Sequence, residues 1–192
     1  KYGNSHINAK EAMTLVTKAA QIALGVVYDS KGNTVTVPSE PHVQTLLDVF
    51  EEVELTPIIV AVPYIPALLS LAETLKTKGW RVTVIYGDIK QSDRKERIRD
   101  FQAGQYDFLL CHPKTLAHGV TLTRSSTVVW YGPTYDLELV SQLNDRIFRY
   151  GQKGQPLIVE LCSTTIENRI YAATHGKETL SGKFIDLFGA SL

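Results

Sequence analysis

Five short runs of apolar, largely β-branched residues constrain the fold of this chain most strongly. Pro57–Val62 (PIIVAV) is apolar throughout, without the alternation of polar and apolar residues that a half-exposed strand shows. Segments with helical patterns separate the runs, so we predict a parallel sheet covered by helices on both faces, a three-layer α/β/α fold. The other predicted strands are Arg81–Tyr86, Asp107–Cys111, Thr127–Tyr131 and Leu157–Cys162.

Helices are expected to connect these strands. Ile98 and Phe101 form the apolar face of a highly charged segment, and Glu167 and Arg169 are expected on the exposed side of the last helix. The predicted helices cover residues 65–78, residues 93–102 after a cap at Ser92, the region of Gln142, and the chain from Thr165 onward.

The first 54 residues are expected to form leading elements packed on a main domain of residues 55–192. These elements are a helix over 8–24, a hairpin with strands at 26–28 and 34–37, and a helix from Pro41 to about Glu52. The apolar side of the first helix is predicted to be Leu15, Ala19, Ile22 and Ala23. We identify no chemistry in this part of the sequence.

Charge and cysteine content limit the possible functions. Twenty basic and twenty acidic residues cancel, so any nucleic-acid binding must come from a local patch. Cys111 and Cys162 lie in apolar, strand-like runs and are expected to be buried free thiols of an intracellular, reducing compartment. No apolar run approaches the ~20 residues of a membrane span, and the start at Lys1 suggests an excised fragment.

The stretch Gln142–Gln152 (QLNDRIFRYGQ) is the strongest candidate for function. Gln142, Arg146 and Arg149 are spaced i, i+4, i+7 and would share one face of a helix that breaks at Gly151. A guanidinium offers a planar fork of donors that matches phosphate oxygens. The alternative is a solvated face on which Asp145 and Arg149 form an ordinary ion pair. An apolar stripe beside this face would consist of Leu139, Leu143 and Ile147.

This Gln-x-x-x-Arg-x-x-Arg-x-Gly-Gln pattern resembles the last conserved motif of superfamily 2 helicases, in the form found in Swi/Snf-like DNA translocases. The resemblance extends roughly from Pro57 to Thr165 and implies the second RecA-like lobe of such a motor. It implies that ATP binds between this lobe and an N-terminal RecA-like lobe. Arg146 and Arg149 would then act as arginine fingers, and Gln142 would contact the nucleotide or the attacking water.

Further candidates follow the predicted strands, where ligands collect in α/β sheets. The resemblance implies that this edge contacts DNA and that Lys114 and Thr115 replace a Ser-Thr pair that grips the backbone. Taken alone, each is a common loop residue, and His112 with His118 forms a poor metal pair. The candidates for nucleic-acid contact are Tyr64, Gly87, Asp88, His112, Lys114 and Thr115.

The segment Ala117–Leu122 resembles the Gly-x-Gly-Ile-Asn-Leu loop that links the nucleotide cleft to the nucleic acid in this family. Gly119 and Thr121 are therefore candidates for ATP contact. Ala117 stands where the family has glycine, and Thr121 where it has asparagine. These departures resemble divergent phage- or prokaryote-type members, which would place the protein in the cytoplasm.

Two signatures of a complete ATPase are absent from the sequence. There is no Gly-x-x-x-x-Gly-Lys-Ser/Thr pattern and no Asp-Glu-x-His/Asp strand end to hold Mg²⁺. We therefore expect the Mg²⁺ ligands in the N-terminal lobe and no hydrolysis of ATP by this chain alone. Two alternatives are an α/β module that binds a nucleotide or phosphorylated ligand by itself, and a helicase-derived nucleic-acid or protein interaction module that is not catalytic.

Overall fold

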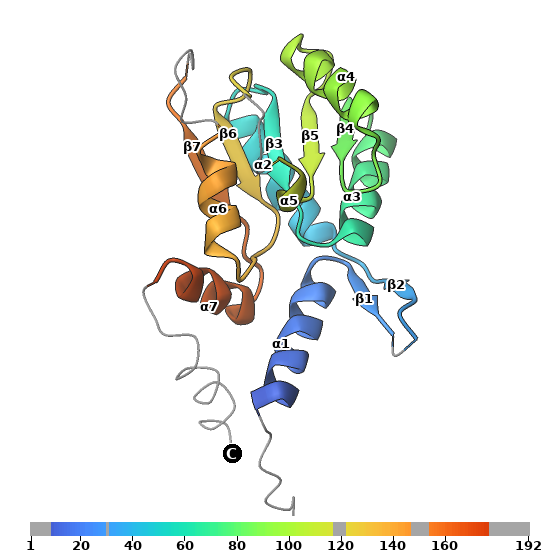
Figure 1. The fold of residues 1–192 in the computed structure, drawn as a ribbon, viewed down its shortest axis with the longest axis vertical. Helices are drawn as coiled ribbons and strands as arrows, with labels where there is room; N and C mark the ends of the chain where they lie inside the picture. Colours follow the sequence, from blue (N-terminus) through green and yellow to red (C-terminus); the bar gives the residue numbers. More distant parts are fainter. Residues whose placement is uncertain (1–8, 30, 117–121, 147–153, 177–192) are drawn as a thin grey trace, which may run out of the picture.

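The computed structural model describes residues 9–29, 31–116, 122–146 and 154–176, and the side chains from Thr14 onward (Figure 1). Its centre is a sheet of five parallel strands in the order β4-β5-β3-β6-β7. The strands are β3 (Ile58–Ala61), β4 (Val82–Ile85), β5 (Phe108–Cys111), β6 (Thr127–Trp130) and β7 (Leu157–Glu160). All five predicted strands and the α/β fold class are confirmed.

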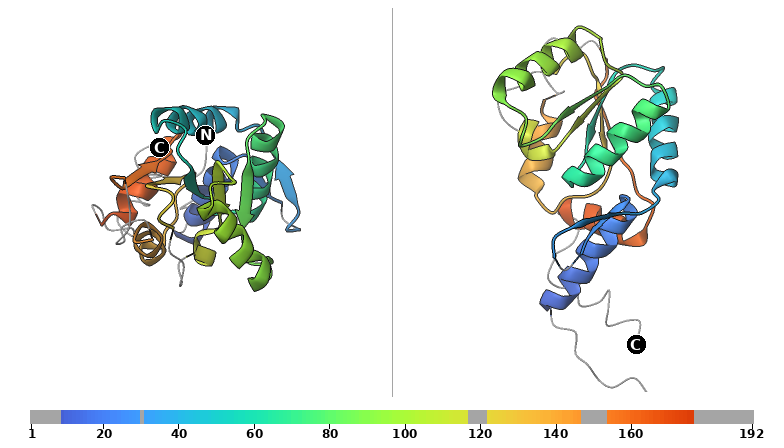
Figure 2. Two further views of the ribbon diagram at one scale, coloured as in Figure 1. Left: turned by 90° about the horizontal axis from the view of Figure 1, so that it is seen from above. Right: turned by 90° about the vertical axis from the view of Figure 1, so that its right-hand side faces the viewer.

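Helices cover both faces of the sheet (Figure 2). Alternate residues of β3 enter different cores: Val60 packs with helices α2 and α3, whereas Ile59 and Ala61 pack with α4, α5 and α6. This double burial explains why the strand sequence is apolar without alternation. The helices are α2 (Glu40–Glu52), α3 (Ile65–Thr77), α4 (Gln91–Gln102), α5 (Pro113–Leu116) and α6 (Leu137–Asn144).

Helix α4 agrees with the prediction in its buried face but not in its start. Phe101 is fully buried and Ile98 packs against the same core, as expected. The residue that caps the helix is Lys90, and the helix begins at Gln91. Ser92 therefore lies inside the first turn, where its hydroxyl donates to Asp93 Oδ1 at 2.8 Å. The predicted cap at Ser92 is wrong because the helix begins two residues earlier than the charge pattern indicated.

Two further helices lie beyond the carboxyl ends of the strands: α1 (Ala9–Ala23) and α7 (Thr165–Thr174) (Figure 1). Val16 and Ala20 of α1 are buried against Ile170 of α7. Leu15 and Ile22 are 49% and 52% exposed, so the predicted apolar side of this helix is wrong. The helix has two apolar stripes. Helix α7 covers the stripe of Val16 and Ala20, and not the predicted stripe of Leu15 and Ile22.

The predicted hairpin is confirmed as β1 (Val26–Tyr28) paired with β2 (Thr34–Thr36). Asp29 closes the turn, since its Oδ1 accepts hydrogen bonds from the amides of Lys31 and Asn33, both at 2.8 Å. In the part of the chain that the structure describes, no helix is long and apolar enough to cross a membrane.

Candidate functional site

The loops after β4 and β5 are joined at the carboxyl edge of the sheet. The amide of His112 donates to the carbonyl of Ile85 at 2.9 Å, and the Thr115 hydroxyl lies 3.2 Å from the same carbonyl. Ile85 ends β4 and is followed within three residues by Gly87 and Asp88, which are exposed. The structure thus brings four of the predicted nucleic-acid residues to one edge.

His112 ties this edge to the loop after β3. Burial lowers the pKa of His112, the positive charge of Lys114 lowers it further, and a hydrogen bond with the Pro63 carbonyl partly opposes both effects. A lowered pKa leaves the ring neutral at pH 7. His112 is therefore a neutral donor that anchors the loop.

Lys114 and Thr115 differ in what they offer to a ligand. The Thr115 hydroxyl donates within the loop, at 2.6 Å from the His112 carbonyl. A phosphate is an acceptor, so Thr115 would have to give up these bonds to contact one. Lys114 is exposed on the short helix α5. Of this pair, Lys114 presents its cation to solvent, and Thr115 supports the loop.

Tyr64 is set among other tyrosines. It precedes α3 with an extended backbone, and its ring packs partly against the core. Burial raises the pKa of Tyr64, and the nearby Tyr28 phenol adds to this increase. Burial also raises the pKa of Tyr135, with a further contribution from Tyr64. Tyr64 therefore lies near one tyrosine of the hairpin and one of the loop after β6.

Helix α6 carries Gln142 and begins directly after Asp136. The Asp136 carboxylate accepts a hydrogen bond from the Leu139 amide at 3.1 Å and so caps the helix. Gln142 is half-buried, and its Nε2 donates to Glu138 Oε1 at 2.7 Å. Its Oε1 is buried and has no hydrogen-bond partner among the described residues. Most buried acceptors in folded proteins are hydrogen-bonded, so this oxygen is available to a further donor.

The prediction that Gln142 and Arg146 share one continuous helix is wrong. Helix α6 ends at Asn144, and Arg146 follows in a tight turn in which its amide donates to the Leu143 carbonyl at 3.0 Å. Asn and Asp are weak helix formers because their side chains compete for backbone groups. In the predicted apolar stripe, Leu143 is fully buried and Leu139 half-buried. The remaining predicted residues of this region lie outside the described residues: Gly119, Thr121, Ile147, Arg149 and Gly151.

Helix α5 packs against α6, and in Figure 1 both helices lie on the same face of the sheet. Their shared core includes Leu116 of α5 and Leu143 of α6. The loop that carries Lys114 and the helix that carries Gln142 are therefore neighbours.

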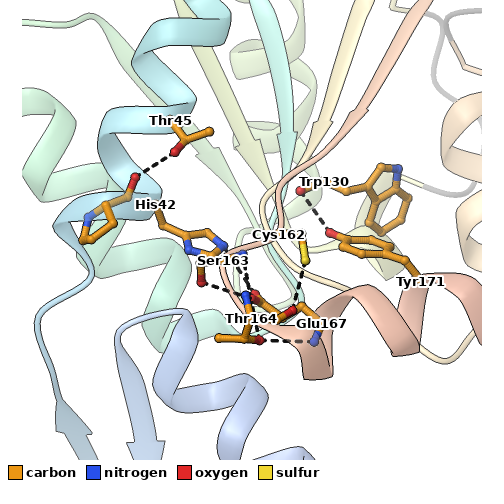
Figure 3. Close-up of polar contacts among 9 residues, drawn as sticks. His42, Thr45, Trp130, Cys162, Ser163, Thr164, Glu167 and Tyr171 are labelled. Carbon is orange, nitrogen blue, oxygen red and sulfur yellow. Dashed lines mark hydrogen bonds and ion pairs between the residues drawn. The ribbon is translucent and has the colours of Figure 1, made fainter.

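A buried polar cluster at the start of α7 was missed by sequence reasoning (Figure 3). Glu167, predicted to be exposed, is fully buried, and its Oε2 accepts from the amides and hydroxyls of Ser163 and Thr164 at 2.9–3.1 Å. Its Oε1 lies 3.3 Å from His42 Nε2, within ion-pair distance but outside hydrogen-bond geometry. The Thr164-x-x-Glu167 spacing is that of a capping box. It could have shown that the Glu167 side chain bonds back to the start of α7 and does not point into solvent.

The two cysteines are free, as expected, but they differ in exposure. Cys111 is buried at the end of β5, whereas Cys162 lies beyond β7 and is exposed. The prediction that both thiols are buried is wrong because β7 ends two residues earlier than its apolar pattern. Within the described ranges, no group of three or more His, Cys, Asp or Glu side chains could hold a metal ion.

The parallel sheet, its two helical layers and the loops gathered at its carboxyl edge define a RecA-like α/β domain. The family of the helicase conserved C-terminal domain matches residues 41–151, which is more than half of the chain. The chain belongs to this family.

Curated relatives are similar to this chain in sequence, and solved structures are similar to it in fold. The chromatin-remodeling ATPase INO80 of Pyricularia oryzae is 31% identical over 110 residues, which is 56% of this chain and 6% of that protein. The DNA excision repair protein ERCC-6-like of Bos taurus is 31% identical over 117 residues, 59% of this chain and 9% of that protein. The chain thus spans less than a tenth of either relative, and neither organism supports a phage or prokaryotic origin.

Among solved structures, the C-terminal part of the Fun30 ATPase domain superposes with a TM-score of 0.68 at 17% identity, covering 79% of this chain and 54% of that one. The C-terminal domain of the DEAD-box protein Dbp5 gives 0.60 at 21% identity, covering 72% and 78%. Both likenesses concern the fold.

Proposed function

We propose that this chain is the second RecA-like lobe of an ATP-dependent, Swi/Snf-like DNA translocase and works against an N-terminal RecA-like lobe of the same parent protein. The observation that carries the proposal is Gln142, half-buried on a helix that packs against α5, with a carboxamide oxygen that has no partner among the described residues. This position lies inside the helicase family match, which runs to residue 151.

The guanidinium groups of Arg146 and Arg149 would neutralise charge that develops on a γ-phosphate, and Gln142 would orient the nucleotide or the attacking water. Gly119 and Thr121 would approach the nucleotide through the loop before β6. ATP supplies the phosphoanhydride bond whose cleavage drives the motor, and the residues that hold Mg²⁺ would belong to the N-terminal lobe. An arginine finger contributes ~10³–10⁵ in rate, so turnover would require the two lobes to close.

The DNA track would run along the edge formed by the loops after β4 and β5. Lys114 would meet a backbone phosphate, while His112 and Thr115 hold its loop against Ile85. Gly87 and Asp88 border the same edge, and Tyr64 would support it from the loop after β3. Lobe closure and opening would then shift this edge along the strand.

The substitution Arg149→Lys in the full-length protein tests the proposal. Lysine keeps the charge but loses the planar fork that spans two phosphate oxygens. DNA-stimulated ATP turnover should fall by about 10²-fold or more while the affinities for ATP and DNA change little, because the interaction forms mainly in the transition state. Arg169→Lys is the matched control, since Arg169 is exposed on α7.

Near-normal turnover by a folded Arg149→Lys protein would overturn the finger assignment. If the unsubstituted full-length protein binds DNA but hydrolyses no ATP, the chain is instead the non-catalytic interaction module. The reading frame of the parent gives an independent check, because the proposed function requires a Gly-x-x-x-x-Gly-Lys-Ser/Thr motif and an acidic Mg²⁺ motif in the preceding lobe.

A further inference from the structure

Trp130 joins the end of strand β6 to the end of helix α6. Its side chain is 1% exposed, and its Nε1 donates a hydrogen bond to Asn144 Oδ1 at 3.0 Å. A buried indole N–H needs an acceptor, because leaving one unsatisfied costs more than the bond contributes. That acceptor comes from the last residue of α6. The end of the helix is thereby fastened to the sheet by a side chain that solvent does not reach.

The backbone of Trp130 is itself fixed from two other directions. Its carbonyl accepts from the Tyr171 hydroxyl of α7 at 3.1 Å (Figure 3) and from the Leu161 amide after β7 at 2.9 Å. Trp130 also pairs with Ala61 of β3 and Glu160 of β7 in the sheet. The residue that holds Asn144 is therefore itself held by β3, by α7 and by the chain of β7 and just after it.

The chain leaves this anchor in a tight turn toward Arg146. The amide of Asp145 donates to the Ser141 carbonyl at 2.9 Å, and the amide of Arg146 donates to the Leu143 carbonyl at 3.0 Å. Leu143 is fully buried in the same core as Trp130. Arg146 follows Asn144 by two residues, so the hydrogen bond between Trp130 and Asn144 determines where the backbone that leads to Arg146 begins.

We infer that Trp130 and Asn144 are positioning residues, which fix where α6 ends and thereby place the backbone of Arg146 at the nucleotide cleft. This inference rests on the proposed function and deepens it, because the position of Arg146 then depends on the hydrogen bond between Trp130 and Asn144 as well as on the helix. A displacement of about 1 Å at a catalytic group can cost ~10²-fold in rate. Loss of the contact should therefore affect turnover more than binding.

The test uses the full-length protein with Trp130→Phe, Asn144→Leu and the double variant. Trp130→Phe removes the donor and Asn144→Leu removes the acceptor, whereas the double variant leaves neither group stranded and so should regain stability. Trp80→Phe is the matched control, because Trp80 packs edge-on against Phe50 on the opposite sheet face. Each protein is assayed for DNA-stimulated kcat, for KM of ATP, and for hydrogen exchange at the Asp145 and Arg146 amides.

We expect kcat to fall about tenfold or more in both single variants and in the double variant, with KM for ATP within about twofold of the unsubstituted protein. The Asp145 and Arg146 amides should exchange faster in all three, and Trp80→Phe should leave both readouts unchanged. Recovery of kcat in the double variant would overturn the inference, because a merely structural contact is restored when both partners become apolar. Unchanged kcat and unchanged exchange in a folded Asn144→Leu protein would also overturn it.

An Arg146→Ala variant separates this inference from the proposed function. If Arg146→Ala leaves turnover intact, the assignment of Arg146 as a finger fails. If Arg146→Ala abolishes turnover but Trp130→Phe and Asn144→Leu do not reduce it, the positioning inference fails by itself.

Discussion

Glu167 shows how a residue that the sequence pattern places on the surface can be held in the core. Its carboxylate caps α7 from within, and the facing ring of His42 lies edge-on to Tyr131, with ring centroids 5.2 Å apart. Burial alone would raise the pKa of Glu167, but the contact with His42 and the hydrogen bonds from Ser163 and Thr164 outweigh burial and lower the pKa. The carboxylate is therefore ionised at neutral pH.

Replacing this carboxylate should destabilise the domain strongly. Glu167→Ala removes the carboxylate that faces His42 and leaves the donors of Ser163 and Thr164 without an acceptor, and we expect a loss of about 3 kcal/mol in the free energy of unfolding. Urea unfolding measures the loss. Glu73→Ala is the control, because Glu73 pairs with Lys76 on the surface and its side chain is 72% exposed. That substitution should cost less than about 1 kcal/mol. Equal losses in the two variants would contradict the buried role of Glu167.

The same residue predicts a dependence of stability on pH. Because the folded-state pKa of Glu167 is lowered, its contribution is fully present above the unfolded-state pKa of about 4.3 and is lost as the pH falls through the lower folded-state value. The urea midpoint of the unsubstituted chain should exceed that of Glu167→Gln at pH 7, and the difference should narrow below about pH 4. A difference that stays constant down to pH 3 would show that folding does not lower the pKa of Glu167.

At the scale of elements, the sequence predicted what local pattern controls and missed what packing controls. All five strands were predictable, because residues such as Ile59 and Val60 face different cores and must both be apolar. The Asp136 cap was predictable from chain-local chemistry. The end of α6 at Asn144 was not, because its acceptor bonds to Trp130, fourteen residues earlier in the chain. The strand order β4-β5-β3-β6-β7 and the edge it assembles also depend on long-range pairing.

Helix α1 gives an element-scale prediction, since its covered face was decided by α7. Val16 is fully buried against Ile170, whereas the neighbouring Leu15 is 49% exposed. Val16→Ala should therefore cost about 2 kcal/mol, from lost burial and the cavity left behind, whereas Leu15→Ala should cost under about 0.5 kcal/mol. Hydrogen exchange along α1 reports the change directly, because a weakened contact would let this helix open locally before the sheet unfolds. Faster exchange in Leu15→Ala than in Val16→Ala would reverse the assigned face.

At the scale of the whole molecule, the cancelling charges mean that any DNA binding must come from a local patch. The formal net charge is zero, and part of the basic side of α4 is already engaged within the domain. Arg97 donates to the Val84 carbonyl at 2.7 Å, and Arg99 pairs with Asp100 at 3.1 Å. Lys114 is exposed on the loop that the β4 and β5 ends hold in place. The candidate track thus depends on few cations, each of which should have a measurable effect.

Binding of duplex DNA to this chain should accordingly be weak and depend on salt. Each phosphate contact contributes about −0.9 to the slope of log K against log salt concentration, so Lys114→Glu should weaken binding and make the slope shallower by about 1. Lys31→Glu changes the net charge by the same amount but lies in the exposed turn of the hairpin, outside the loops after β4 and β5. If overall charge governed binding, the two variants would lose affinity equally. If the loop after β5 forms the track, the Lys31→Glu slope should match that of the unsubstituted chain and only Lys114→Glu should differ. Titrations between about 50 and 200 mM salt span the range in which phosphate contacts change affinity measurably. An unchanged slope in Lys114→Glu would remove this loop from the track while leaving the fold and the arginine assignments untouched.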